Sequence, residues 1–132
     1  MSRINAIVTA STIIEWIQRN QEQIETHPAW YHHISENEAE ALLRDRSPLT
    51  YLLCSGEKEH SYFISFVKED GSIKHQSFVL ELDKRGWYYR NGSTSKYPAG
   101  VISKDLEELI PLMMHCDPSS CIHLTNKNAT LG

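Results

Sequence analysis

Thiol and imidazole side chains are the groups of this 132-residue chain that can do chemistry. His115-Cys116 begins as the signature of a cysteine phosphatase does, but the position that requires an arginine holds Ile122. Cys54 lies inside a run of strand-forming residues, where neither a helix amino terminus nor a neighbouring base would activate its thiol. Neither cysteine is expected to be a nucleophile, and we predict that the chain is not an enzyme.

A set of four soft and imidazole donors lies near the carboxyl terminus: His115, Cys116, Cys121 and His123. Zinc accepts such ligands, but their spacing matches no common zinc finger. Cysteines packed in a core and histidines on a surface are the more frequent reason for such residues. We therefore predict no metal site and no cofactor.

Length and composition restrict the kind of protein. A chain of 132 residues can form one hydrophobic core, and its net charge of −4 argues against nucleic acid as a partner. Apolar runs are all shorter than the roughly 18 residues that a membrane span needs. Three cysteines are an odd number that fits no small secreted framework. We expect a soluble protein with reduced thiols in the cytoplasm, or in the host cytosol if it is a microbial effector.

The first predicted element is an amino-terminal helix. Thr12 and Glu15 have the spacing of a capping box, and the apolar residues that follow recur at helical spacing: Ile13, Trp16, Ile17 and Ile24. His27-Pro28 is expected to end this helix. A narrow apolar stripe usually packs against its own domain, and self-association of two chains through the helix is the alternative.

The remaining pattern predicts an α+β fold, with a central antiparallel sheet flanked by two further helices. One helix is expected from Ser35, capped with Glu38, to Ser47-Pro48, and another opens at Ser103 and contains Pro111. Strands are expected at 49–55, 61–67, 73–82, 87–90 and 121–124, with a tight turn at Asp70-Gly71 and a loop at 91–100. The predicted boundaries are 1–28 for the helical extension, 29–125 for the domain and 126–132 for a tail.

Seven segments of the chain, in order and at the right spacing, resemble a Src-homology-2 domain between about Trp30 and Thr125. These segments are Trp30-Tyr-His-His-Ile-Ser35, Tyr51-Leu-Leu-Cys-Ser55, Ser61-Tyr-Phe-Ile-Ser65, Ile73-Lys-His75, Trp87-Tyr-Tyr89, Asp105-Leu-Glu-Glu-Leu-Ile110 and Cys121-Ile-His-Leu124. The resemblance implies a signalling adaptor module whose partners are tyrosine-phosphorylated peptides or proteins.

The chain departs from the family at two positions that usually contact the phosphate. The near-invariant arginine falls on Cys54, and a second arginine falls on Glu36. Losing a buried, charge-assisted pair costs about 2–5 kcal/mol, or roughly 30-fold to several thousand-fold in affinity. The resemblance implies that the phosphotyrosine-binding residues are Cys54, Ser55, Gly56, Glu57, Lys58, His75 and Ser77, and that Gln76, Ser93 and Thr94 select the peptide.

Three interpretations of Cys54 remain open. The chain is an inactivated or engineered version of the domain, a natural variant that binds phosphate through Lys58 and backbone donors, or a domain that recognises an unphosphorylated peptide or protein surface. Arg44 and Arg46 precede the signature strand, where solvent-exposed charges are the simpler expectation. We expect a phosphotyrosine-peptide binding module with an altered phosphate site, and the alternative is a phosphate-independent interaction domain on the same fold.

Overall fold

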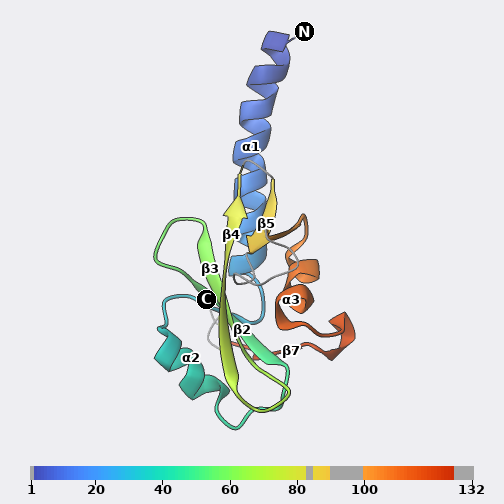
Figure 1. Cartoon of the computed structure of the whole chain (residues 1–132). Helices are drawn as coiled ribbons and strands as arrows, with labels where there is room; N and C mark the ends of the chain where they lie inside the picture. The colour runs from blue at the N-terminus through green and yellow to red at the C-terminus, as the bar shows by residue number, and fades with distance from the viewer. Residues whose placement is uncertain (1, 83–84, 90–99, 127–132) are drawn as a thin grey trace.

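The structure is a computed structural model that describes residues 2–82, 85–89 and 100–126, with side chains from residue 12 onward. Its helices are α1 (Ser2–Glu25), α2 (Glu36–Leu43), α3 (Leu106–Met114) and a short 3₁₀ turn, η1 (Pro118–Ser120). Its strands are β1 (Trp30–Tyr31), β2 (Thr50–Ser55), β3 (Ser61–Val67), β4 (Ile73–Glu81), β5 (Gly86–Tyr89), β6 (Val101–Ser103) and β7 (Ile122–His123). Figure 1 shows α2 and α3 on opposite sides of the sheet, with α1 extending beyond it.

The sheet has the strand order β1-β2-β3-β4-β5-β6, and it is antiparallel from β2 to β6. Two short strands pair in parallel with the other edge of β2: β1 pairs with Leu53 and Cys54, and β7 pairs with Thr50 and Tyr51. The predicted α+β class is confirmed, and the two parallel pairs are an addition to the antiparallel sheet that the pattern predicted. Within the described part of the chain, no helix is long and apolar enough to cross a membrane.

Strand β2 is apolar along almost its whole length because both of its faces are covered. On one face Leu52 and Cys54 pack in a cluster with Ala39 and Leu43 of α2. On the other face Leu53 belongs to the larger cluster, to which α1 and α3 contribute. A strand covered on both sides was the prediction for this segment, and the structure confirms it.

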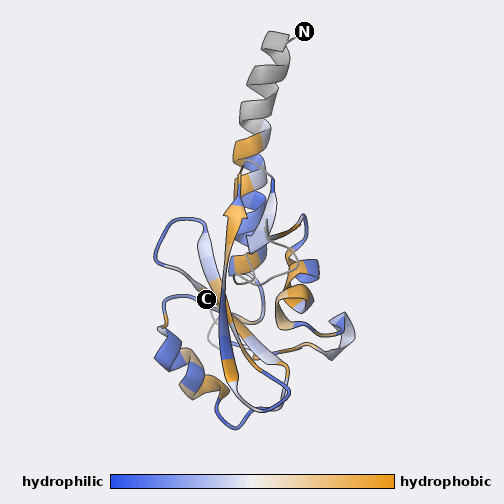
Figure 2. Ribbon diagram, in the orientation of Figure 1, coloured by the Kyte–Doolittle hydropathy of each residue, from blue (hydrophilic) through white to orange (hydrophobic). Residues whose placement is uncertain are grey.

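The carboxyl-terminal part of α1 packs on the domain through the larger cluster. Ile24 is 0% exposed in this cluster, which also contains Leu106 and Leu109 of α3, while Ile14 further up α1 is 57% exposed. Figure 2 shows the apolar part of α3 facing the sheet and α1, with hydrophilic turns on the outer side. The carboxyl-terminal end of the apolar stripe, at Ile24 and in part Trp16, therefore packs on its own domain, and self-association through the helix remains a prediction.

Helix boundaries at two places differ from the prediction. Helix α1 begins at Ser2, so Thr12 lies inside the helix and is not its cap. Helix α3 begins after the N-cap Asp105, whose side chain accepts a hydrogen bond from the Glu107 backbone, so the predicted start at Ser103 is wrong. The capping box of Ser35 and Glu38 at the start of α2 is confirmed.

The strands follow the prediction closely, except for the short β1 and β6, which were not predicted. Strand β3 has the predicted bounds, and Gly71 takes a positive φ of 89° in the predicted turn after Asp70. Strand β6 begins at Val101, directly after the predicted loop at 91–100, and it ends at Ser103, where a helix was expected to open. Most of that loop, with Ser93 and Thr94, lies outside the described residues, as does most of the predicted tail.

Candidate functional site

A hollow of about 740 Å³ opens between the start of α2, the connection from β2 to β3, and strands β3 and β4. Its lining combines apolar walls with hydroxyl, carboxylate and amine groups. The lining residues are His33, Ile34, Glu36, Ser55, Gly56, Glu57, Lys58, Ser61, Tyr62, Phe63, Ser77, Phe78 and Val79. Five of the seven residues expected to bind phosphotyrosine are among them: Ser55, Gly56, Glu57, Lys58 and Ser77.

Ser61 organises the connection that forms one wall of the hollow. The Lys58 backbone N–H donates to Ser61 Oγ at 3.0 Å, and the Gly56 N–H donates to the Ser61 carbonyl at 2.8 Å. The Ser61 hydroxyl in turn donates to the Lys58 carbonyl. A Cβ atom at Gly56 would lie 2.6 Å from Ser61 Oγ, so a larger residue here would displace the Ser61 hydroxyl. The Gly56 and Lys58 amides therefore hold the connection together and are already engaged before any ligand arrives.

Ser55 joins the end of β2 to the segment that precedes α2. Its hydroxyl donates to the His32 carbonyl at 2.5 Å and lies 3.2 Å from His33 Nδ1. His33, which the sequence did not single out, thereby becomes part of the lining. Its only signal in the sequence is its place inside the Trp30-to-Ser35 segment.

Cys54 does not line the hollow, because it is 0% exposed in the cluster beneath α2. Burial, with a smaller contribution from Glu38, raises the pKa of its thiol to about 12. The thiol is therefore protonated and uncharged at neutral pH. Its register partner on β3 is Phe63, a lining residue, and Phe63 pairs in turn with Ser77 on β4, so Cys54 lies one strand from one lining residue and two strands from another.

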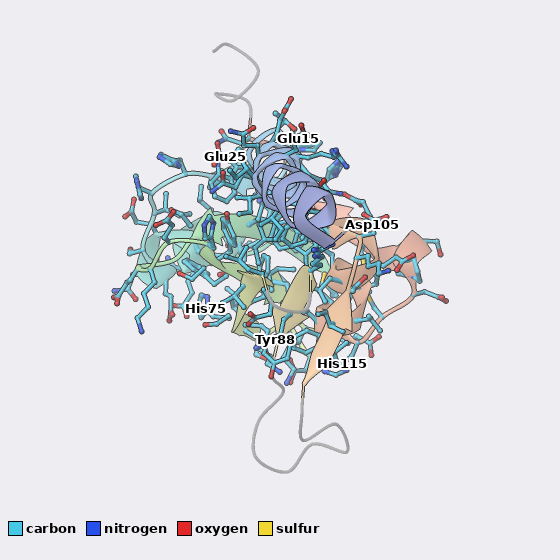
Figure 3. All side chains as sticks on the ribbon, turned by 90° about the horizontal axis from the view of Figure 1, so that it is seen from above. Glu15, Glu25, His75, Tyr88, Asp105 and His115 are labelled. Carbon is cyan, nitrogen blue, oxygen red and sulfur yellow. The ribbon has the colours of Figure 1, made fainter. Side chains whose placement is uncertain are left out.

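His75 is held under α2 instead of reaching the hollow. Its Nδ1 lies 2.6 Å from Ser65 Oγ, and its Nε2 lies 2.9 Å from Glu40 Oε1. The ring can accept from the serine at one nitrogen and donate to the carboxylate at the other, so both nitrogens have partners within the chain. Figure 3 shows His75 on the same side of the molecule as α2, away from His115.

The charges around the hollow are mainly negative. Among its described lining residues, Lys58 carries the one fixed positive charge, while Glu36 and Glu57 are carboxylates. Neither Arg44 nor Arg46 lines the hollow, and Arg46 Nε donates to the Leu42 carbonyl at 3.3 Å. A dianionic ligand would therefore meet Lys58 as its cationic partner.

Of the residues expected to select the peptide, Gln76 is described, and it does not line this hollow. The Gln76 side-chain amide donates to the Ser77 carbonyl at 2.9 Å, and Gln76 pairs with Ile64, whose side chain belongs to the opposite core cluster. Ser93 and Thr94 lie outside the described residues. A selective surface next to the hollow stays a prediction.

A second group of polar side chains surrounds His27, on the other side of the sheet. The buried His27 accepts from the Ala29 N–H through Nδ1 at 3.0 Å, and its Nε2 lies 2.8 Å from Glu107 Oε1. The Tyr51 hydroxyl is 3.5 Å from the same nitrogen. Burial lowers the pKa of His27 despite the opposing attraction of Glu107. The neutral ring joins the end of α1 to α3.

This lowered pKa predicts a loss of stability in acid. The unfolded chain takes up a proton at His27 near the ordinary value, whereas the folded chain resists it to lower pH, so the free energy of unfolding falls as pH drops below about 6.5. Urea unfolding at pH 7.5 and 5.5 measures the effect. His27→Gln is expected to lose less stability over this interval than the unchanged chain, while His115→Gln, at the exposed end of α3, should lose as much. Equal losses in all three proteins would contradict the account.

The four donors considered as zinc ligands do not come together. Cys116 Sγ and Cys121 Sγ are 3.1 Å apart, but His115 borders a different hollow with Leu49 and Lys74, and His123 packs edge-on against the His27 ring. Within the described residues, no group of three or more histidine, cysteine or acidic side chains is arranged to hold a metal ion.

Comparison with known proteins gives no further guide to the class of protein. No protein-family description matches the chain, and no curated protein matches it.

Proposed function

We propose that the chain is a peptide-binding module of the Src-homology-2 type, in which the hollow beside α2 receives a tyrosine side chain of a partner protein. The observation that carries this proposal is the position of the hollow, between the start of α2 and the 56–60 connection. In the Src-homology-2 domains that the chain resembles, these two segments surround the phosphotyrosine. The apolar side chains of Ile34 and Phe63 suit an aromatic ring, and Lys58 and Ser77 suit an acceptor at its end.

Phosphate on that tyrosine is expected to add little affinity. A phosphotyrosine carries close to two negative charges and needs several cationic or N–H donors. Here the buried thiol of Cys54 supplies no charge, and the amides of Gly56 and Lys58 already donate to Ser61. Lys58 is left to attract the phosphate against the carboxylates of Glu36 and Glu57.

Lys58→Ala is therefore expected to weaken binding of a phosphorylated tyrosine peptide by on the order of 10-fold, because it removes a charge-assisted hydrogen bond. The unphosphorylated twin of the peptide should be bound almost as before. Calorimetric titration of both peptides, first from a degenerate tyrosine library and then as single sequences, provides the affinities. Lys104→Ala, which removes an equal charge beyond β6, is the matched control and should change neither affinity.

A second candidate is a phosphate-independent interaction domain on the same fold. The two carboxylates that line the hollow favour it, since they repel a phosphate but not a neutral tyrosine. It predicts that the unphosphorylated peptide binds at least as tightly as the phosphorylated one and that Lys58→Ala weakens the binding of neither. A phosphorylated peptide bound several-fold more tightly than its twin would exclude this candidate.

We also propose the cytoplasm as the location and signalling partners with exposed tyrosines as the ligands. Reduced cysteines support the location, since the described residues contain three free thiols. A domain whose hollow binds a peptide and catalyses no reaction on it would act as an adaptor.

A further inference from the structure

Two cysteines face each other where α3 is followed by β7. Cys116 and Cys121 lie on either side of η1, and their Sγ atoms are 3.1 Å apart. Both are partly exposed, and both pack against the edge of the larger core cluster. The peptide-binding hollow does not include either residue, so this pair has no part in the function proposed above.

We propose that Cys116 and Cys121 are a site of reversible oxidation, at which a small disulfide such as oxidised glutathione converts the two thiols into an intramolecular disulfide. Thiols in contact need only a short approach to bond, because the S–S bond length is about 2.05 Å. The third cysteine cannot compete, since Cys54 is wholly buried beneath α2.

The backbone around the pair holds the two sulfur atoms in this arrangement. The Cys116 N–H donates to the Pro111 carbonyl at 3.1 Å, which fixes the first cysteine to the end of α3. The Ser120 N–H donates to the Asp117 carbonyl at 2.9 Å, which closes the η1 turn just before Cys121. Little chain entropy remains to be lost when the bond forms, so an intramolecular disulfide is favoured over two separate adducts.

The reaction is an exchange in two balanced steps. The Cys116 thiolate attacks one sulfur of oxidised glutathione, which forms a mixed disulfide and releases one glutathione thiolate. Cys121 then gives up its proton and attacks the Cys116 sulfur of the mixed disulfide, which releases the second glutathione thiolate. The two protein thiols are oxidised by two electrons, and one oxidised glutathione is reduced to two thiols.

The order of attack follows from the surroundings of the two thiols. Burial and the hydrogen bond with Cys116 raise the pKa of Cys121 to about 12, so this thiol is rarely ionised while Cys116 is reduced. Cys121 is therefore the second thiol to react, after the mixed disulfide has replaced its hydrogen-bonding neighbour.

Oxidation would fasten the end of α3 to β7, the strand that pairs with β2. A closed loop as short as that between residues 116 and 121 reduces the freedom of the unfolded chain, and we expect the Tm to rise by roughly 5 °C. Reduction by dithiothreitol should restore the original Tm.

The test uses the full chain, incubated with mixtures of reduced and oxidised glutathione, quenched in acid, and alkylated after unfolding. The expected result is the loss of two of the three thiols without retained glutathione, and a peptide map that joins Cys116 to Cys121. Cys116→Ser should leave Cys121 largely unmodified, Cys121→Ser should stop at a glutathione adduct on Cys116, and Cys54→Ser should behave as the unchanged chain. Glutathione retained on the unchanged chain, or a disulfide that includes Cys54 or a second chain, would overturn the proposal. Since the peptide map uses the unchanged chain, the test does not depend on whether the variants fold.

Discussion

Cys54→Arg is expected to raise the affinity for a tyrosine-phosphorylated peptide by about 30-fold to several thousand-fold, which corresponds to about 2–5 kcal/mol. Cys54 stands in register with Phe63 and Ser77, and both of these residues line the hollow. An arginine at this position is long enough to pass beside Phe63 and present its guanidinium to the phosphate. Its planar fork would supply two parallel charge-assisted hydrogen bonds that the neutral thiol cannot make.

Titration of the phosphorylated peptide and its unphosphorylated twin against both proteins measures this effect. Cys54→Met is the matched control, because methionine has much of the length of arginine and none of its charge. We expect Cys54→Met to leave the affinity for the phosphorylated peptide unchanged and Cys54→Arg to gain affinity for that peptide alone. An equal gain for the unphosphorylated peptide, or for the methionine variant, would show that the effect arises from packing and not from a phosphate contact.

Glu36 is expected to limit this gain. Its carboxylate lines the same hollow and would compete with the phosphate for the new guanidinium. Glu36→Gln in the background of Cys54→Arg should therefore raise the affinity further.

Ile24→Ala is expected to lower the free energy of unfolding by about 2–5 kcal/mol, since it removes a fully buried side chain from the larger core cluster. Ile24 is the point at which α1 enters this cluster, beside residues of β2 and α3. Urea unfolding measures the loss. Ile14→Ala on the same helix is the control, because Ile14 is 57% exposed and its truncation should cost no more than about 0.5 kcal/mol.

The two variants also test the predicted boundary between residues 28 and 29. A large loss for Ile24→Ala with a small one for Ile14→Ala would mean that the last turns of α1 are part of the domain core. Equal small losses would mean that α1 is an appendage, and that the domain from residue 29 is stable without it.

Local sequence patterns predicted the elements that local forces determine. The Ser35 and Glu38 capping box and the aromatic and β-branched run of β3 each lie within a few residues, so their signals were complete in the sequence. Thr12 and Glu15 have the same spacing but lie inside α1. The spacing alone does not show where a helix begins, so it predicted a cap that is not there. Strand β6 is three residues long and depends on its pairing with β5, a partner more than ten residues away in the chain.

The candidate site was predicted only where the resemblance supplied it. The lining residues Ser55, Lys58 and Ser77 were found in this way, but the role of Ser61 was missed, since it depends on how the connection folds back. His75 was expected in the hollow and lies outside it because the carboxylate of Glu40, 35 residues earlier in the chain, accepts a hydrogen bond from its ring. Such partners distant in sequence leave no signal in one chain.

The central claim is that the hollow beside α2 is the site at which a tyrosine peptide binds. Titration of the ¹⁵N-labelled chain with a phosphorylated tyrosine peptide, followed by amide chemical shifts, tests it most directly. The account predicts that the largest shifts occur at Ser55, Lys58, Ser61 and Ser77, with little change at Ile102 and Lys104 beyond the far edge of the sheet. Shifts concentrated around His27 and His123, or spread along α1 alone, would contradict it.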